Sequence, residues 1–193
     1  MNKLYLDGCS FTYGLGLPHE DTLGHLFTSS GYAVSNNSRN GKSNLAIAMD
    51  AYKNIDNHDV IVLGFTFSGR FYIDHNGHKI DFQPIYYYHQ FKPNDDYNSA
   101  AIEDEYSTFH KHFYTLYQAP FCDDLSDCLI DTLSEFIKSK GKKLIVFSWE
   151  KRNVNTEILY PYIGPRYRLS DGHLNSLGTR YLFDLLQSRL GEK

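Results

Sequence analysis

The residues that most constrain the fold are 59–64, with the sequence DVIVLG. They are apolar and mostly β-branched, without the alternation of polar residues seen in half-exposed strands. This pattern is typical of a strand that is buried on both faces of a parallel sheet. Such a strand needs parallel neighbours and helices packed over both faces. The sequence therefore predicts an α/β fold built around this strand.

The rest of the chain supplies candidates for those neighbours and helices. Strands are expected at residues 4–6, 32–34 and 143–149, and helices at 22–30, 45–54, 125–140 and 177–190. Residues 150–169 are polar and are expected to form a long loop. Because strands and helices alternate, we expect a three-layer α/β/α sandwich with a parallel sheet of four or five strands.

Length and composition narrow the class of protein. A chain of 193 residues is the size of one domain, so residues 1–193 are expected to form a single domain. The formal net charge of −4 gives no general attraction to nucleic acid or an anionic membrane, and neither partner is expected. Spanning a bilayer takes about 18 consecutive apolar residues, and every apolar run in this sequence is much shorter. No signal peptide is evident. Together with an odd number of cysteines, 3, these features predict a cytoplasmic protein.

Ser10 is a candidate nucleophile. The strand at residues 4–6 ends in the small and polar sequence DGCS, and ligands of open parallel sheets bind at the carboxyl ends of the strands. Gly8 and Gly14 allow backbone geometries that other residues resist. A serine in this position can also be a plain helix cap, so Ser10 needs partners before a catalytic role is inferred.

Those partners occur at the other end of the chain. Asp171 precedes His173 by two residues, in a loop that leads into the amphipathic stretch 177–190. A catalytic serine needs a histidine to take its proton and a carboxylate to fix the tautomer of that histidine. Ser10, His173 and Asp171 would supply all three groups.

The two ends together resemble the SGNH or GDSL-type serine hydrolases. The first block of that family is a strand followed by Gly-Asp-Ser, and residues 8–14 of this chain read GCSFTYG. The last block places an Asp and a His close together before an Asn, a Gly and a helix, and residues 171–178 read DGHLNSLG. The resemblance implies a flavodoxin-like sheet, with Ser10 as nucleophile, His173 as base and Asp171 as the residue that orients the base.

The resemblance also implies an oxyanion hole. A glycine in the loop after the second strand supplies one backbone donor in the family, and Gly41 fits that position. The backbone N–H of Ser10 would be a second donor. The third block of the family is Gly-x-Asn, but Thr66 stands where the Asn is expected. A hydroxyl can donate a hydrogen bond with a different reach, so Thr66 or Ser68 could replace the amide, and Asn44 is another candidate.

Three further residues near these blocks are candidates for substrate binding. Asn44 and Ser68 carry polar groups that could contact the substrate or supply the missing donor. Arg70 could bind an anionic group of the substrate, although a surface salt bridge is an equally good interpretation.

Residues 71–121 fit no periodic pattern and are too long for an ordinary connection. They are rich in tyrosine and phenylalanine, and we expect an insertion that is helical over about residues 99–117 and covers the active-site edge. Whether it forms a lid, a dimer surface or a small aromatic core stays open. The histidines at positions 75, 78, 110 and 112 have no cysteine or carboxylate at a recognised zinc spacing, so no metal is expected.

The leading hypothesis is a cofactor-free serine hydrolase that cleaves a carboxylic ester through an acyl-enzyme. The expected substrate is a small molecule or carbohydrate that carries a short acyl group. Two alternatives stay open: an O-acyltransferase that uses the same three residues, and a non-catalytic binding or structural module. A homo-oligomer is compatible with the sequence. Cys9 is a stronger intrinsic nucleophile than Ser10, but neighbouring residues at a strand end point in opposite directions, so Cys9 is expected to be a packing residue.

Overall fold

The computed structural model describes residues 1–75, 78–82 and 119–191, with side chains for 1–70 and 122–191. Its main sheet has five strands in the order β2-β1-β3-β6-β7, and every adjacent pair is parallel. The strands are β1 (Lys3–Gly8), β2 (Ala33–Asn36), β3 (Val60–Phe65), β6 (Lys143–Ser148) and β7 (Ile158–Leu159). The predicted parallel α/β sheet is therefore confirmed.

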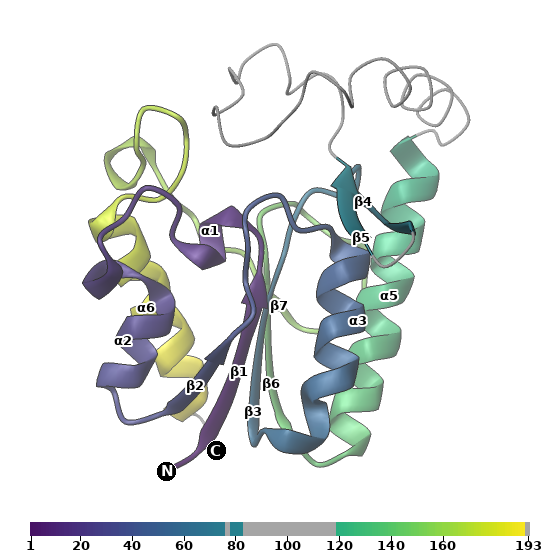
Figure 1. Ribbon diagram of the computed structural model, residues 1–193, viewed down its shortest axis with the longest axis horizontal. Helices are drawn as coiled ribbons and strands as arrows, with labels where there is room; N and C mark the ends of the chain where they lie inside the picture. The colour runs from purple at the N-terminus through teal and green to yellow at the C-terminus, as the bar shows by residue number, and fades with distance from the viewer. Residues whose placement is uncertain (76–77, 83–118, 192–193) are drawn as a thin grey trace.

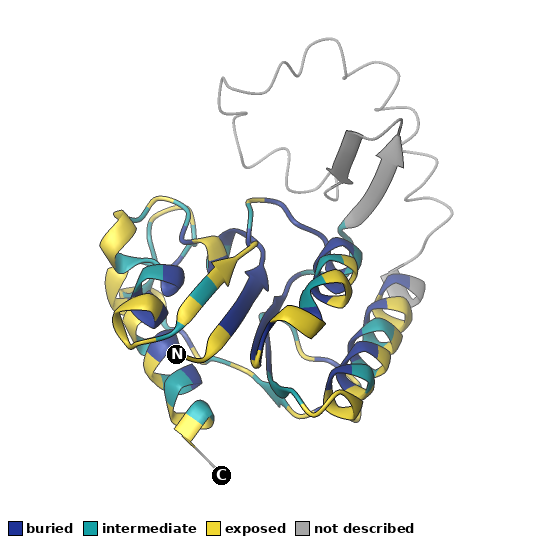
Figure 2. Cartoon of the chain, turned by 60° about the horizontal axis from the view of Figure 1, so that its bottom comes forward, coloured by how far each residue is buried: buried dark blue, intermediate teal, exposed yellow. Residues whose placement is uncertain are grey.

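Helices cover both faces of this sheet (Figure 1). On one face lie α2 (Leu23–Ser29) and α6 (Ser176–Gly191), and on the other lie α3 (Asn44–Asn54) and α5 (Ala119–Ser139). Side chains alternate along the strands, so each face has its own apolar core. Leu6 packs in the core beside α2 and α6, whereas Tyr5 packs in the core beside α3 and α5. Figure 2 shows the central strands in the dark blue of buried residues.

The helix boundaries follow local signals in the sequence. Ser43 caps α3, and its hydroxyl accepts a hydrogen bond from the backbone N–H of Ala46 at 3.3 Å. α5 begins at Ala119, earlier than the predicted start at residue 125. Among the residues described, no helix is both long and apolar enough to span a membrane.

Two strand features were not predicted. β7 lies inside residues 150–169, which were expected to be a loop, and pairs with the end of β6 through only two residues. An antiparallel hairpin of β4 (Phe71–His75) and β5 (His78–Phe82) opens the expected insertion. The predicted helix at 99–117, with most of the aromatic residues, lies outside the described residues, as do the side chains of the four histidines considered for metal binding.

The turn from β1 into the short helix α1 (Ser10–Tyr13) depends on two glycines that face each other. Gly8 on β1 pairs with Gly64 on β3. A Cβ at Gly8 would lie 2.1 Å from Oγ1 of Thr12, and a Cβ at Gly64 would lie 2.5 Å from the same atom. Thr12 therefore needs both glycines, because α1 folds back directly onto the strand ends. Gly8 is required because a side chain would not fit there. Unusual backbone geometry was expected at both Gly8 and Gly14, but of these two only Gly14, with φ 84°, has it.

Candidate active site

Ser10 and His173 are 163 positions apart in the sequence and meet at the carboxyl edge of the sheet. Ser10 is the first residue of α1, and its Oγ lies 2.9 Å from Nε2 of His173. Nδ1 of His173 lies 3.1 Å from Oδ2 of Asp171, at ion-pair distance but without the alignment of a direct hydrogen bond. The backbone N–H of His173 donates to Oδ1 of Asp171 at 3.0 Å. The structure thus brings these three residues into one series of contacts.

The loop that carries Asp171 and His173 is held by its own backbone and by one arginine. The N–H of Leu169 donates to the carbonyl of His173 at 2.7 Å, and the N–H of Gly172 donates to the carbonyl of Leu169 at 3.0 Å. Gly172 has φ 89°, in the left-handed region that favours glycine. Nη1 of Arg168 donates to the Gly172 carbonyl at 2.7 Å. These contacts fix the turn between the acid and the histidine.

The carboxyl group of Asp171 is ionised at neutral pH. Burial opposes ionisation, but the backbone N–H, the ring and the charge of His173 together favour it more strongly. The pKa of Asp171 is therefore lower than that of an ordinary aspartate. The side chain is 46% exposed, so water screens part of this interaction.

Aromatic rings surround the imidazole. The Phe11 ring centroid lies 5.0 Å from that of His173 and 4.6 Å from that of Trp149. Phe11 and Trp149 also pack against the apolar core beside α2 and α6. They therefore connect the imidazole to the rigid part of the molecule. Sequence reasoning missed both, because an aromatic residue beside a strand end is indistinguishable from an ordinary core residue.

The loop after β2 carries Gly41 along the end of β1. The N–H of Asn37 donates to the carbonyl of Leu6 at 2.8 Å, and the N–H of Arg39 donates to the carbonyl of Gly8 at 3.2 Å. Gly41 is buried and has φ 73°, so its position favours glycine. The N–H of Ser10 is the first amide of α1, where an amide has no partner within the helix.

Thr66 and Asn44 are bound to each other. Oδ1 of Asn44 accepts a hydrogen bond from the N–H of Thr66 at 2.8 Å, and its Nδ2 donates to the carbonyl of Thr66 at 3.0 Å and to Ser126 Oγ at 3.2 Å. Asn44 is 2% exposed, so its amide has no donor left for a substrate. The hydroxyl of Thr66 is buried and has no hydrogen-bond partner within the described structure. Asn44 therefore joins the start of α3 to the end of β3 through hydrogen bonds.

Ser68 and Arg70 lie just beyond the end of β3. The hydroxyl of Ser68 donates to Asp123 at 2.5 Å, and its backbone N–H donates to Glu150 at 3.2 Å, so Ser68 is engaged with the protein. The guanidinium carbon of Arg70 lies 5.4 Å from the Phe67 ring centroid. Its Nη1 is buried and has no hydrogen-bond partner in the described part of the chain. That nitrogen is not accessible to a ligand, but Arg70 as a whole is partly exposed, so its role in binding an anionic group stays a prediction.

A buried charge pair lies next to the β1 strand end and was missed from the sequence. Nζ of Lys42 is 2.7 Å from both carboxylate oxygens of Asp7, and both side chains are 0% exposed. Burial raises the pKa of Asp7, and the Lys42 charge only partly opposes this. Burial and the charge of Asp7 also raise the pKa of Tyr5, whose protonated hydroxyl donates to Asp7 at 2.8 Å. The sequence did contain one sign of this pair, since Asp7 is a carboxylate in an otherwise mostly apolar strand.

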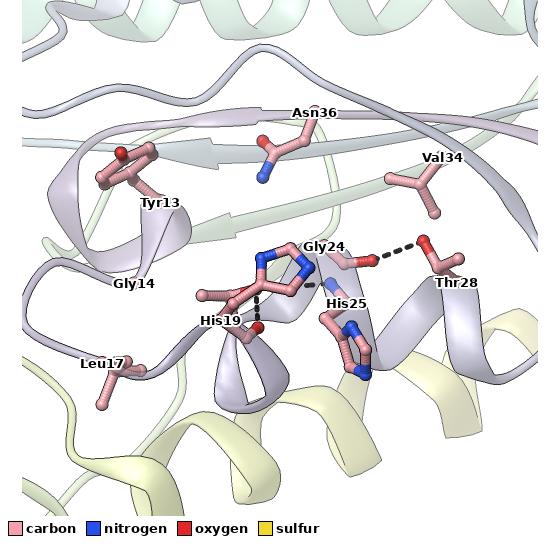
Figure 3. Close-up of a pocket in the computed structure, with 10 residues that line it drawn as sticks. Tyr13, Gly14, Leu17, His19, Gly24, His25, Thr28, Val34 and Asn36 are labelled. Atoms are coloured by element: carbon pink, nitrogen blue, oxygen red, sulfur yellow. Dashed lines mark hydrogen bonds between the residues drawn. The ribbon is translucent and has the colours of Figure 1, made fainter.

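A cavity of about 460 Å³ opens beside α1, between α2 and β2. Figure 3 shows Tyr13, His25 and Asn36 around it. Of its lining residues, Tyr13 lies about one helical turn after Ser10 on α1. Ser10, Asp171 and His173 are not among the described residues that line it, so the cavity is separate from their contacts.

Two other sequence expectations concern nucleophiles and metals. Cys9 is 0% exposed and lies in the protein interior, as expected of a packing residue. In the described ranges no three His, Cys, Asp or Glu side chains cluster in a way that could hold a metal ion.

Comparison with known proteins identifies solved structures of similar fold. No model of a known protein family matches the chain, and no curated protein does so. The crystal structure of TesA superposes over 97% of this chain and 97% of its own, with a TM-score of 0.53 and 12% identity. The psychrotrophic esterase EstA from Pseudoalteromonas sp., inhibited by monoethylphosphonate, superposes over 100% of both chains, with a TM-score of 0.52 and 10% identity. The chain therefore has the fold of the SGNH and GDSL esterases that its two terminal motifs resemble.

Proposed function

We propose that the protein is a serine hydrolase that cleaves a carboxylic ester. The observation that carries this proposal is the 2.9 Å contact between Ser10 Oγ and His173 Nε2, with Asp171 on the other side of the imidazole. A serine is a weak nucleophile until a neighbouring base accepts its proton, and this arrangement supplies the base and the group that orients it. The likeness of fold to an esterase supports the same reaction class.

The proposed reaction has two steps. First, Ser10 Oγ attacks the acyl carbon while Nε2 of His173 takes the hydroxyl proton, and the resulting tetrahedral oxyanion expels the carrier alcohol, which receives that proton. The acyl group is then bound to Ser10. Second, water gives a proton to His173 and attacks the acyl carbon, and the carboxylic acid leaves as Ser10 regains its proton. Asp171 holds the imidazole throughout and stabilises its charged form.

The oxyanion would be stabilised by the backbone N–H groups of Ser10 and Gly41. Each lies in a segment connected to the end of β1, and a fixed backbone donor needs no reorganisation during the reaction. Thr66 is a candidate third donor, and its buried hydroxyl has no hydrogen-bond partner among the residues described, but it is 0% exposed. Two backbone donors would therefore provide most of the stabilisation.

The proposed substrate carries a short acyl group on a carbohydrate or another small polar molecule. Arg70 supports an anionic or strongly polar carrier, because it is a partly exposed cation just beyond the end of β3. An anionic ester should then have a lower KM than a neutral ester of the same acyl group, and Arg70→Ala should remove the difference.

A fluorophosphonate tests the reaction class directly, because such a probe modifies only an activated serine. Intact mass should show one adduct on the wild-type protein and on Ser139→Ala, an exposed serine at the end of α5. Ser10→Ala should give no adduct, and His173→Ala should react at least about 10²-fold more slowly. Absence of an adduct on folded wild-type protein would contradict the proposal and favour a binding module. Product analysis with added alcohols then separates hydrolysis from acyl transfer.

A further inference from the structure

Lys42 is a fully buried cation whose partners surround it. Its Nζ lies 2.7 Å from both oxygens of Asp7, 2.8 Å from Oδ2 of Asp50 and 3.1 Å from the carbonyl of Asn37. The side chain is 0% exposed, as is that of Asp7. An ammonium has three protons, and these acceptors satisfy all of them. The lysine is therefore held in one place.

The acceptors of Lys42 are themselves fixed by neighbours. Nδ2 of Asn37 donates to Asp50 Oδ2 at 3.1 Å and to the Tyr5 hydroxyl at 3.1 Å, and that hydroxyl donates to Asp7 at 2.8 Å. Arg39 lies 3.7 Å from Asp50 and adds a second positive charge. The group therefore connects β1, the loop after β2 and α3 through charged and polar contacts.

The position of this group in the chain relates it to the proposed oxyanion hole. Lys42 directly follows Gly41, and Asp7 precedes Ser10 by three residues on β1. The two proposed backbone donors, Ser10 and Gly41, thus belong to segments that are joined by the Lys42–Asp7 contact. The backbone hydrogen bonds of Asn37 and Arg39 to β1 lie on the other side of Gly41 in the loop. Gly41 is therefore fixed from both directions.

Neither direct catalysis nor stability explains the pair well. Side chains that are 0% exposed cannot touch a substrate. A buried ion pair also contributes little net stability, since apolar residues of similar volume often stabilise a fold as well or better. What a buried pair can supply is a unique conformation of the segments that it joins.

We propose that Lys42 and Asp7 are positioning residues that set the place of the Gly41 N–H relative to Ser10. This inference rests on the proposed hydrolase function and extends it to the residues that hold the oxyanion hole. If the pair is removed, Ser10 and His173 should keep their contact, because that contact is made directly between their side chains. The donor at Gly41 should become misplaced.

The first test compares Lys42→Met with Lys143→Met on a chromogenic acetyl ester. Lys143 is a matched control, because its Nζ donates to the carbonyl of Leu190 and is remote from Gly41 in the chain. Lys42→Met should lower kcat on the order of 10²-fold, the size of the loss of one oxyanion donor, with KM changed less than about 3-fold. Lys143→Met should leave kcat within about 3-fold of wild type. A wild-type kcat in folded Lys42→Met would overturn the proposal.

Lys42→Met leaves Asp7 buried without its partner and can fail to fold, so a second variant removes both charges. The double variant Asp7→Leu with Lys42→Met keeps the volume apolar, which favours folding. Its kcat should fall as far as that of Lys42→Met. A folded double variant with the wild-type kcat would also overturn the proposal.

A double-mutant cycle separates positioning from a general structural effect. Gly41→Ala strains a residue at φ 73° and displaces the donor directly. In that background, Lys42→Met should lower kcat by less than about 3-fold further, because the donor that it positions is already lost. An equal, additive loss in both backgrounds would show that Lys42 does not act through Gly41. If wild-type protein gives a phosphonate adduct but the cycle is additive, this inference fails while the hydrolase proposal stands.

Discussion

Asp171 is the most exposed of the three proposed catalytic residues, and its ionisation still depends on its neighbours. Its side chain is 46% exposed, against 12% for that of His173. Since the pKa of Asp171 is lowered by folding, its ionised form stabilises the native state at pH values above the ordinary carboxyl pKa of about 3.9. That contribution disappears as the pH falls through the lowered pKa.

Asp171→Asn should therefore show two effects. The kcat should fall between about 10²- and 10⁴-fold at pH 7, because the imidazole loses the charge that orients it. Urea unfolding should show a stability difference from wild type at pH 7 that shrinks below about pH 4. Asp124→Asn, at an exposed position of α5, is the control and should change neither quantity. A difference that grows in acid would contradict the assigned direction of the pKa shift.

At the scale of elements, the position of Ser10 depends on how closely α1 approaches the sheet. A Cβ at Gly64 would lie 2.3 Å from Cζ of Phe147 and 2.5 Å from Oγ1 of Thr12. Neither side chain has room to move away, because Phe147 and Thr12 are both 0% exposed. The Gly8–Gly64 pair is thus a condition for α1, and through α1 for the contact between Ser10 and His173.

Gly64→Ala should displace α1 and lower stability by about 1–3 kcal/mol, the usual cost of overpacking a core. The rate of phosphonate labelling of Ser10 should fall with it, whereas the urea m-value should stay unchanged. Gly164→Ala is a matched control, because a Cβ there meets nothing within 4 Å and the residue has φ −70°. If Gly64→Ala labelled at the wild-type rate, the close approach of α1 would not control Ser10.

At the scale of the whole molecule, two separate apolar cores share one sheet. Leu182 on α6 belongs to one core and Ile130 on α5 to the other, and both are 0% exposed. Since they belong to different clusters on opposite faces of the sheet, truncations at the two positions should not share a cavity. The sheet nevertheless couples them, because its strands contribute side chains to both cores.

Leu182→Ala and Ile130→Ala should each lower the free energy of unfolding by about 2–5 kcal/mol. The double variant should lose the sum of the two within about 0.5 kcal/mol. Urea titrations followed by circular dichroism and by tryptophan fluorescence should give coincident transitions, as expected if the sheet joins both cores in one cooperative unit. Two separated transitions would mean that the two faces unfold independently.

The parallel sheet and its helices were predictable from the sequence, whereas the pairing of Ser10 with His173 was an expectation from the two terminal motifs. Strands and helices leave periodic patterns in neighbouring residues, and a parallel sheet collects the ends of its strands at one edge. β7 was not predictable, because it pairs through two residues and leaves no period to detect. The engagement of Asn44 with Thr66, 22 positions away, was equally invisible.

What the sequence determined by itself is the alternation of buried strands and amphipathic helices, because that information is local. Only the tertiary structure decided that Lys42 and Asp7, 35 positions apart, form a buried pair, and that a serine and a histidine at opposite ends of the chain come within 2.9 Å. The reason is physical: a charged side chain has many possible partners along a sequence, and its actual partner depends on which segments the sheet places side by side.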